Sequence, residues 1–254
     1  MNFEALLAHH LLDHQYFPMF KAGGVTFGMT KHLVMMWIVG ALCLTVLSFA
    51  ARSQSRVGLL VRTAVEVIIL YIRDNVLGPI FGHATGTYLP YFLTLFFFIF
   101  TCNLAGLVPY GSTVTGNISV TLALASMTFF LIHFAGVKEQ GLVSYIAHIA
   151  PGGLPKLLVP LIFCIEIMGL FAKCIALCIR LFANMIAGHI VSLAFLSLIF
   201  IFSQMSPYIG LGVAPAAVGL ALFVYTLDLL VSLLQAYIFT FLTALFVGGA
   251  VHPH

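Results

Sequence analysis

Residues 161–206 read LIFCIEIMGLFAKCIALCIRLFANMIAGHIVSLAFLSLIFIFSQMS, a run of 46 residues without proline. As one unbroken helix this run would be about 68 Å long at about 1.5 Å per residue, whereas the hydrocarbon core of a bilayer is about 30 Å thick. Neither end carries the charged residues that would let it stand out in water. The run therefore predicts a helix that lies steeply tilted in a membrane, and a break at Gly169 or Gly188 is the alternative.

A second long apolar segment follows, because no proline occurs between Pro215 and Pro253. The 95 residues from Leu157 to Val251 contain only four charged residues: Glu166, Lys173, Arg180 and Asp228. We therefore expect two long, oblique helices at about residues 157–206 and 216–250, joined by a proline-containing turn at residues 206–215.

The composition of the whole chain is that of an integral membrane protein. Its residues are 62% hydrophobic and 7% charged, and its mean hydropathy is +1.16. The net charge of +3 is small and scattered, so we expect no nucleic-acid partner. The five cysteines lie in apolar runs and are expected to act as small hydrophobic residues, although Cys174 and Cys178 share a helix face that could in principle bind a metal. The sequence has no Gly-rich phosphate loop of the Walker type, and we expect no nucleotide site, no cofactor and no metal.

Residues 1–30 differ from the rest in being mixed and rich in histidine. They lack the basic start and the apolar core of a signal peptide. His9, His10 and His14 could bind a metal, but a solvated, partly helical segment outside the membrane is the simpler expectation. Residues 31–254 are expected to form a single membrane domain.

Three shorter apolar stretches precede the long pair and complete an all-α integral membrane protein. Each has about 20 residues with few charges, which is the length of a transmembrane helix. We expect these spans at about residues 32–51, 88–108 and 117–135. Residues 56–74 differ, because Arg62, Glu66 and Arg73 fall on one helical stripe while apolar residues cover the rest. That pattern predicts an amphipathic helix lying in the membrane interface.

The distribution of Lys and Arg orients the five expected crossings. If the amino terminus is outside, most basic residues fall on the inside: Arg52, Arg56, Arg62, Arg73, Lys138 and Lys156. The two outer turns contain no Lys or Arg, and only Lys21 and Lys31 lie outside. We therefore expect the amino terminus outside and the carboxyl terminus inside.

Charged residues of the long helix form one stripe. Glu166, Lys173 and Arg180 are spaced by seven residues, so each steps back only about 20° around the helix. Asn184 lies one turn beyond Arg180. An ionisable group inside a bilayer costs about 2.5 to 3.5 kcal/mol on insertion scales, so a functional role is the default expectation.

Titratable residues flank the arginine on both sides. His189 lies about 180° round the helix from Arg180, and Asp228, seven residues before Gln235, reaches a similar outer depth on the returning helix. Glu166 lies towards the inner side. A proton could enter from either side but could not pass a permanent cation, which indicates a split pathway that needs a moving carrier. A structural ion pair is the alternative: Arg180 with Asp228 is geometrically possible, whereas Glu166 is about 21 Å from Arg180 along the helix.

Residues 177–189, LCIRLFANMIAGH, closely resemble the signature of subunit a of the F-type ATP synthase. Three further stretches look like landmarks of that family, in the family's order: NLAGLVP at 103–109, GNISVTLA at 116–123 and LQAYIF at 234–239. The resemblance covers most of the chain from Tyr88 onward. It implies a non-catalytic stator subunit that supplies two offset proton half-channels to a ring of c subunits.

The resemblance also implies roles for single residues. Arg180 would face the ring and force each ring carboxylate to release its proton, and Glu166 matches the acidic residue of the inner half-channel. His189 and Asp228 match a pair of outer positions in the order that mitochondrial members use, with Asp in place of Glu. Three amides fall at positions associated with the ring contact and the polar pathway: Asn103, Asn184 and Gln235. Gly106 departs from the pattern, because several relatives have Asp there.

Partners and location follow from the same resemblance. It implies a ring of c subunits, peripheral-stalk b subunits and the remainder of the FoF1 complex, in a bacterial inner membrane or, alternatively, a mitochondrial inner membrane. Two other interpretations remain. A stand-alone secondary transporter with Glu166, Arg180 and Asp228 as its substrate site would carry solute by itself. In a purely structural anchor, mutation of Arg180 would affect assembly and not flux.

Overall fold

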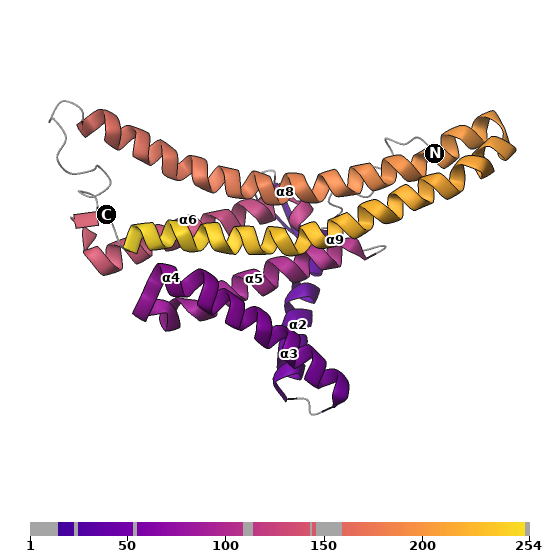
Figure 1. The fold of residues 1–254 in the computed structure, drawn as a ribbon. Coiled ribbons are helices and arrows are strands. Elements are labelled where there is room, and N and C mark those ends of the chain that lie inside the picture. Colours follow the sequence, from indigo (N-terminus) through magenta and orange to yellow (C-terminus); the bar gives the residue numbers. More distant parts are fainter. Residues whose placement is uncertain are drawn as a thin grey trace. The chain divides into compact units, whose positions relative to one another are not determined.

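The structure is a computed structural model, and it describes residues 15–22, 25–52, 55–108, 114–142, 144–145 and 159–251, with the backbone alone in residues 15–29. Figure 1 shows the fold in the colours of the sequence. The named elements are, in chain order, β1 (Gln15–Ala22), β2 (Val25–Thr30), α2 (Lys31–Arg52), α3 (Arg56–Tyr71), the π-helical turn η1 (Ile72–Leu77), α4 (Gly78–Phe81), the 3-10 turn η2 (Gly82–Ala84), α5 (Thr85–Leu107), the 3-10 turn η3 (Val114–Gly116), α6 (Ile118–Gln140), α8 (Val159–Met205) and α9 (Pro207–Val251).

Ahead of the first long helix, β1 and β2 form an antiparallel two-stranded ribbon. Its pairs run from Ala22 opposite Val25 to Gln15 opposite Thr30. The partly helical character that we expected is therefore wrong for residues 15–30. Aromatic and β-branched residues explain the strands: Tyr16, Phe17, Phe20, Val25, Thr26 and Phe27. The three candidate metal ligands lie outside the described residues: His9, His10 and His14.

The first long helix, α2, turns apolar side chains outward. It has 22 residues, and Trp37 and Leu44 are 73% and 69% exposed. A helix of this length with an apolar exterior is suited to lipid.

The helix expected at residues 56–74 is longer and changes its pitch. Ser55 begins it, because the Ser55 hydroxyl accepts a hydrogen bond from the Gly58 N–H at 3.0 Å. α3 then passes through η1 into α4, and the helical run turns at Gly82, whose φ of +51° suits glycine. The Gly78-Pro79 step does not end the helical run, because Pro79 lies in the first turn of α4, where a missing N–H is tolerated.

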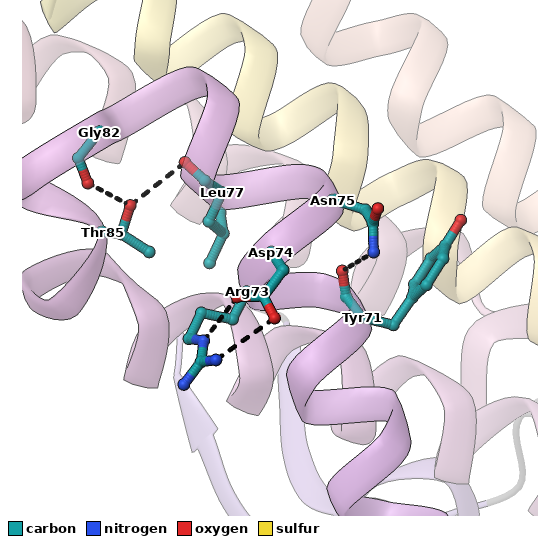
Figure 2. A network of polar contacts seen from close by, with 7 residues as sticks. All are labelled: Tyr71, Arg73, Asp74, Asn75, Leu77, Gly82 and Thr85. Carbon is teal, nitrogen blue, oxygen red and sulfur yellow. Dashed lines mark hydrogen bonds and ion pairs between the residues drawn. The ribbon is translucent and has the colours of Figure 1, made fainter.

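Polar contacts hold the region around this change of pitch (Figure 2). Arg73 Nε donates to Asp74 Oδ1 at 2.7 Å, and the side chain of Asn75 donates to the carbonyl of Tyr71, one turn before it, at 3.3 Å. The hydroxyl of Thr85 donates to the carbonyl of Gly82 at 2.7 Å and so closes the turn into α5. Both side chains of the Arg73–Asp74 pair are about half exposed.

α5 and α6 lie within a few residues of two expected spans, 88–108 and 117–135. Pro90 is near the start of α5, where few intrahelical bonds are lost. The helix then buries one face: Phe92, Leu95, Phe96, Ile99 and Cys102. α6 runs to Gln140 and is followed by Gly141, whose φ is +80°.

α8 and α9 form the long helical pair. They have 47 and 45 residues, and α8 runs without a break through Gly169 and Gly188. The turn between them is shorter than expected, because Ser206 alone separates the two helices and Pro215 lies inside α9. Pro207 can begin α9, since the first helical position needs no N–H donor. Membrane helices tolerate internal prolines such as Pro215 more readily than soluble ones do.

Within the described residues, five helical runs are long and apolar enough to cross a membrane. In the most apolar windows of α8 and α9 only 11% and 17% of the residues are buried. Such large apolar surfaces need lipid or partner subunits to cover them. The prediction of an all-α integral membrane protein is thereby confirmed, with the ribbon as an addition.

The described residues cluster into two compact units. The first draws on Met1–Val46, Phe97–Asn117 and Leu181–Ala236, and the second on Leu47–Phe96, Ile118–Arg180 and Tyr237–His254. α8 and α9 therefore contribute to both units. In the first unit their halves next to Ser206 run side by side (Figure 1), and the backbone of Gly210 lies against Ser203.

Candidate functional site

The predicted charged stripe lies on a single helix. Because α8 is continuous, the spacing of seven residues keeps Glu166, Lys173 and Arg180 on one side, and all three side chains are exposed. Within the described part of the second unit, no ion pair joins Glu166 to Arg180. Asn184 lies one turn beyond the arginine and is half-buried. The structure thus leaves the guanidinium group of Arg180 outside the packed interior of its unit.

Lys173 makes a contact that the sequence did not indicate. Its ammonium nitrogen lies 5.4 Å from the centre of the Phe246 ring, a cation–π contact between α8 and the last turns of α9. No spacing rule within one helix could reveal this pairing, since the partners are far apart in the chain. The contact directs the ammonium group of Lys173 towards α9.

Asp228 packs against α8 beside His189. The carboxylate of Asp228 occupies the space that a β-carbon at Gly188 would fill, and Gly188 immediately precedes His189. Both Asp228 and His189 are partly buried, and the carbonyl of His189 accepts a hydrogen bond from Ser192 at 3.1 Å. The structure therefore brings Asp228 to the height on α8 that the sequence predicted, within one residue.

Asn103 connects three elements of the first unit. It is 1% exposed, its amide donates to the Ser232 carbonyl of α9 at 3.3 Å, and its oxygen accepts from the hydroxyl of Thr115 at 2.8 Å. Thr115 was missed by the sequence analysis, although a buried amide in an apolar helix requires a polar partner and this turn offers hydroxyl groups. Asn103 thus holds the end of α5 and the turn η3 against α9.

Gln235 lies one turn after Ser232 on α9 and is 6% exposed. Among the described residues of its unit, its side-chain nitrogen has no hydrogen-bond partner. A buried amide donor of this kind is costly and calls for a functional or solvent partner. The structure brings Gln235 close to the Ser232 site of Asn103 along the helix, but does not join the two amides.

Two cysteines and one histidine of the second unit are engaged with neighbouring groups. Cys178 lies 3.4 Å from the hydroxyl of Thr121, and Cys174 donates to the carbonyl of Ala125 at 3.3 Å. Among the described residues, no group of three or more His, Cys, Asp and Glu residues could hold a metal ion. His133, which the sequence analysis did not select, pairs with the hydroxyl of Tyr145 at 2.7 Å.

Within the described residues, five helical runs are long and apolar enough to span a membrane, which defines the class of multi-pass, all-α membrane proteins, and one of them, α8, carries a stripe of exposed charges. The family model described as ATP synthase A chain matches residues 33–248. The chain belongs to this family.

Three bacterial proteins illustrate the similarity, and each carries the name ATP synthase subunit a. The protein of Chloroherpeton thalassium is 40% identical over an alignment of 258 residues that covers 96% of this chain and 75% of that protein. The protein of Pelodictyon phaeoclathratiforme is 43% identical over an alignment of 263 residues, with the same coverage of 96% and 75%. The protein of Anaeromyxobacter dehalogenans strain 2CP-C is 41% identical over an alignment of 237 residues that covers 91% of this chain and 60% of that protein. The predicted resemblance is therefore confirmed, and with it a place in ATP synthesis and proton transport at a membrane.

Proposed function

We propose that this chain is the proton-translocating stator subunit of a rotary ATP synthase, with two offset half-channels that open to a ring of c subunits. The observation that carries the proposal is Arg180, an exposed cation on an otherwise apolar helix of a chain in the ATP synthase A chain family. The chain has no nucleotide site of its own, and the chemistry of ATP takes place on other subunits of the complex.

Arg180 separates the two half-channels by its charge. A guanidinium group stays protonated under all physiological conditions, so a proton cannot pass it as a second positive charge. A ring carboxylate that comes close to the guanidinium is stabilised in its ionised form and gives up its proton. The ring is then the only carrier between the outer and the inner route.

The other site residues fall to the two sides of this barrier. His189 and Asp228 serve the outer half-channel, and what supports this role is the approach of Asp228 to α8 beside His189. Glu166 serves the inner half-channel from the inner part of α8. Three amides stabilise polar groups and water along the route: Asn103, Asn184 and Gln235.

The partners are the ring of c subunits, the peripheral-stalk b subunits and the other subunits of the FoF1 complex. The outward apolar faces of α8 and α9 supply surface for the ring and for lipid. The Lys and Arg pattern supports an amino terminus outside and a carboxyl terminus inside a bacterial inner membrane, in keeping with the bacterial relatives. A mitochondrial inner membrane is the alternative location.

The decisive experiment replaces Arg180 in the assembled ATP synthase. Arg180→Ala should assemble normally and reduce ATP-driven proton pumping and gradient-driven ATP synthesis to background, while passive proton leak through the membrane sector increases. Arg56→Ala is the matched control, because it removes an exposed arginine at the start of α3 and should leave pumping unchanged. Normal pumping by Arg180→Ala would refute the proposal, and loss of assembly together with intact pumping per assembled complex would favour a structural anchor.

A further inference from the structure

A second polar cluster lies in the second unit, around the last turns of α6. His133 Nδ1 and the Tyr145 hydroxyl are 2.7 Å apart, and the edge of the His133 ring meets Phe129 with ring centres 4.3 Å apart. Both His133 and Tyr145 are partly buried. The function proposed above uses neither residue.

Backbone and side-chain contacts hold Tyr145 against α6. Gly141 ends the helix with a φ of +80°, and its carbonyl accepts a hydrogen bond from the Tyr145 N–H at 2.9 Å. The Tyr145 ring then lies directly on Gly136, where any β-carbon would collide with it. The side chain of Gln140 donates to the Ala250 carbonyl at 2.6 Å and holds α6 against the end of α9. The backbone bond to Gly141 and the contact with Gly136 thus hold the Tyr145 ring where its hydroxyl meets His133.

The packing of α6 against α8 gives the height of His133 on the long helix. Three contacts pair the helices in antiparallel register: Thr121 with Cys178, Ala125 with Cys174, and Phe129 with Phe171. Each step of four residues along α6 moves three or four residues back along α8, so the next step pairs His133 with residue 167 or its neighbour Glu166. His133 therefore lies at the height of Glu166, whose side chain is exposed on α8.

The chemistry of this pair suits proton transfer. Burial raises the pKa of Tyr145 above its ordinary value, so the phenol stays neutral at physiological pH and its oxygen remains able to accept a hydrogen bond. An imidazole whose Nδ1–H donates to that oxygen is held in one tautomer, with the lone pair of Nε2 available. A water molecule that has received a proton from Glu166 can then transfer it to Nε2, where one N–H bond forms as one O–H bond breaks. Release of the same proton from Nε2 to water on the inner side returns the neutral imidazole.

We propose that His133 is a proton-relay residue of the inner half-channel and that Tyr145 is its positioning residue. The inference rests on the proposed function, because it extends the route that begins at Glu166. The charged residues on the described lengths of these two packed helices are Lys138 and Glu139 on α6 and Glu166, Lys173 and Arg180 on α8. Lys173 is held on Phe246, and the carboxylate of Glu166 is the group at the height of the imidazole.

The test uses the assembled ATP synthase in membrane vesicles and compares two substitutions of His133. Glutamine keeps a hydrogen bond to Tyr145 but does not titrate. His133→Gln should therefore assemble and pump protons about 100-fold more slowly, the lower end of what a positioned acid–base group contributes. His133→Ala should be equally slow and should recover part of its pumping when imidazole is added to the inner medium. His83→Gln is the matched control, because His83 is exposed in η2.

The positioning role of Tyr145 is tested by the pH profile of pumping. Tyr145→Phe should keep part of the flux and shift the pH of half-maximal flux downward, because the imidazolium loses the acceptor of its Nδ1–H. Tyr208→Phe, at a tyrosine that is 87% exposed, is the control and should not shift the profile. An unchanged profile in Tyr145→Phe overturns the positioning role.

Two further variants separate this inference from the proposed function. If Arg180→Ala is inactive while His133→Gln pumps normally, the relay is wrong and the stator function stands. If Arg180→Ala and Glu166→Leu both pump normally, the proposed function itself is wrong. If His133→Gln fails to assemble, the test of the relay is whether added imidazole restores pumping in His133→Ala. No rescue by imidazole, together with an unchanged pH profile in Tyr145→Phe, refutes the relay.

Discussion

At the scale of single residues, the space next to Gly188 controls the position of Asp228. The carboxylate of Asp228 fits against α8 only because residue 188 has no side chain. We expect Gly188→Ala to displace Asp228 and to reduce ATP-driven proton pumping, with a packing cost of about 1 to 3 kcal/mol. Pumping rate and thermal stability of the assembled complex measure the two effects.

Gly169→Ala is the matched control for this substitution. Gly169 lies on the same helix, but nothing is within 4 Å of a β-carbon built there. Alanine should therefore be neutral or slightly stabilising at this position, since it favours the helix by about 1 kcal/mol over glycine. Equal effects at positions 169 and 188 would mean that the space beside Asp228 is unimportant.

His189 and Asp228 should act as one unit in the outer half-channel. We expect His189→Ala and Asp228→Ala each to slow proton pumping strongly. The double variant should pump little more slowly than the slower single variant, because either substitution alone already interrupts the same proton transfer. The measurement is a double-mutant cycle on ATP-driven pumping, with assembly checked for each variant. Losses that simply multiply would show that the two residues work independently.

At the scale of elements, the hydrogen bonds of Asn103 join α5, η3 and α9. We expect Thr115→Val to lower the stability of the complex by about 1 to 3 kcal/mol, because the buried oxygen of Asn103 loses its donor. Thr63→Val is the control, since the exposed Thr63 hydroxyl donates only to a carbonyl of its own helix. Thermal unfolding in detergent, followed by loss of pumping, would reveal the difference. Equal melting temperatures for the two variants would contradict a structural role for the Thr115 bond.

The long helices were predictable from the sequence, whereas their turn was not. The absence of proline between residues 160 and 207 is a direct signal for an unbroken α8. The expected turn at residues 206–215 assumed that both prolines interrupt helices. Pro207 instead begins α9 and Pro215 lies within it, because the cost of a proline depends on its position in the helix and on the neighbouring groups that replace the lost hydrogen bond.

At the scale of the whole molecule, a stator and a transporter differ in what the chain does alone. We expect the purified chain to be inert to solute and to proton gradients when it is reconstituted into liposomes, because its route lacks the moving carrier. Proton pumping should appear when the c ring and the remaining subunits are added. Solute transport by the chain alone would favour the secondary transporter, with Glu166, Arg180 and Asp228 as its substrate site.

The sequence could predict the positions of the site residues along the helices, but not the side-chain contacts between elements. Helical spacing was enough to put Glu166 and Arg180 on one stripe and Asp228 near the height of His189. The contacts of Asn103 with Thr115 and of His133 with Tyr145 depend on how separate elements pack, which no periodicity within one element contains. The strands at residues 15–30 were missed because a short mixed segment has no long repeat to identify it.

The contact of Lys173 with Phe246 matters in a membrane that separates two compartments of different pH. An ion pair between a lysine and a carboxylate weakens when the carboxylate is protonated. The strength of such a contact would therefore depend on the pH of the adjoining compartment. The phenyl ring has no proton to gain or lose. The contact between α8 and the end of α9 therefore does not depend on the protonation state of an acidic partner.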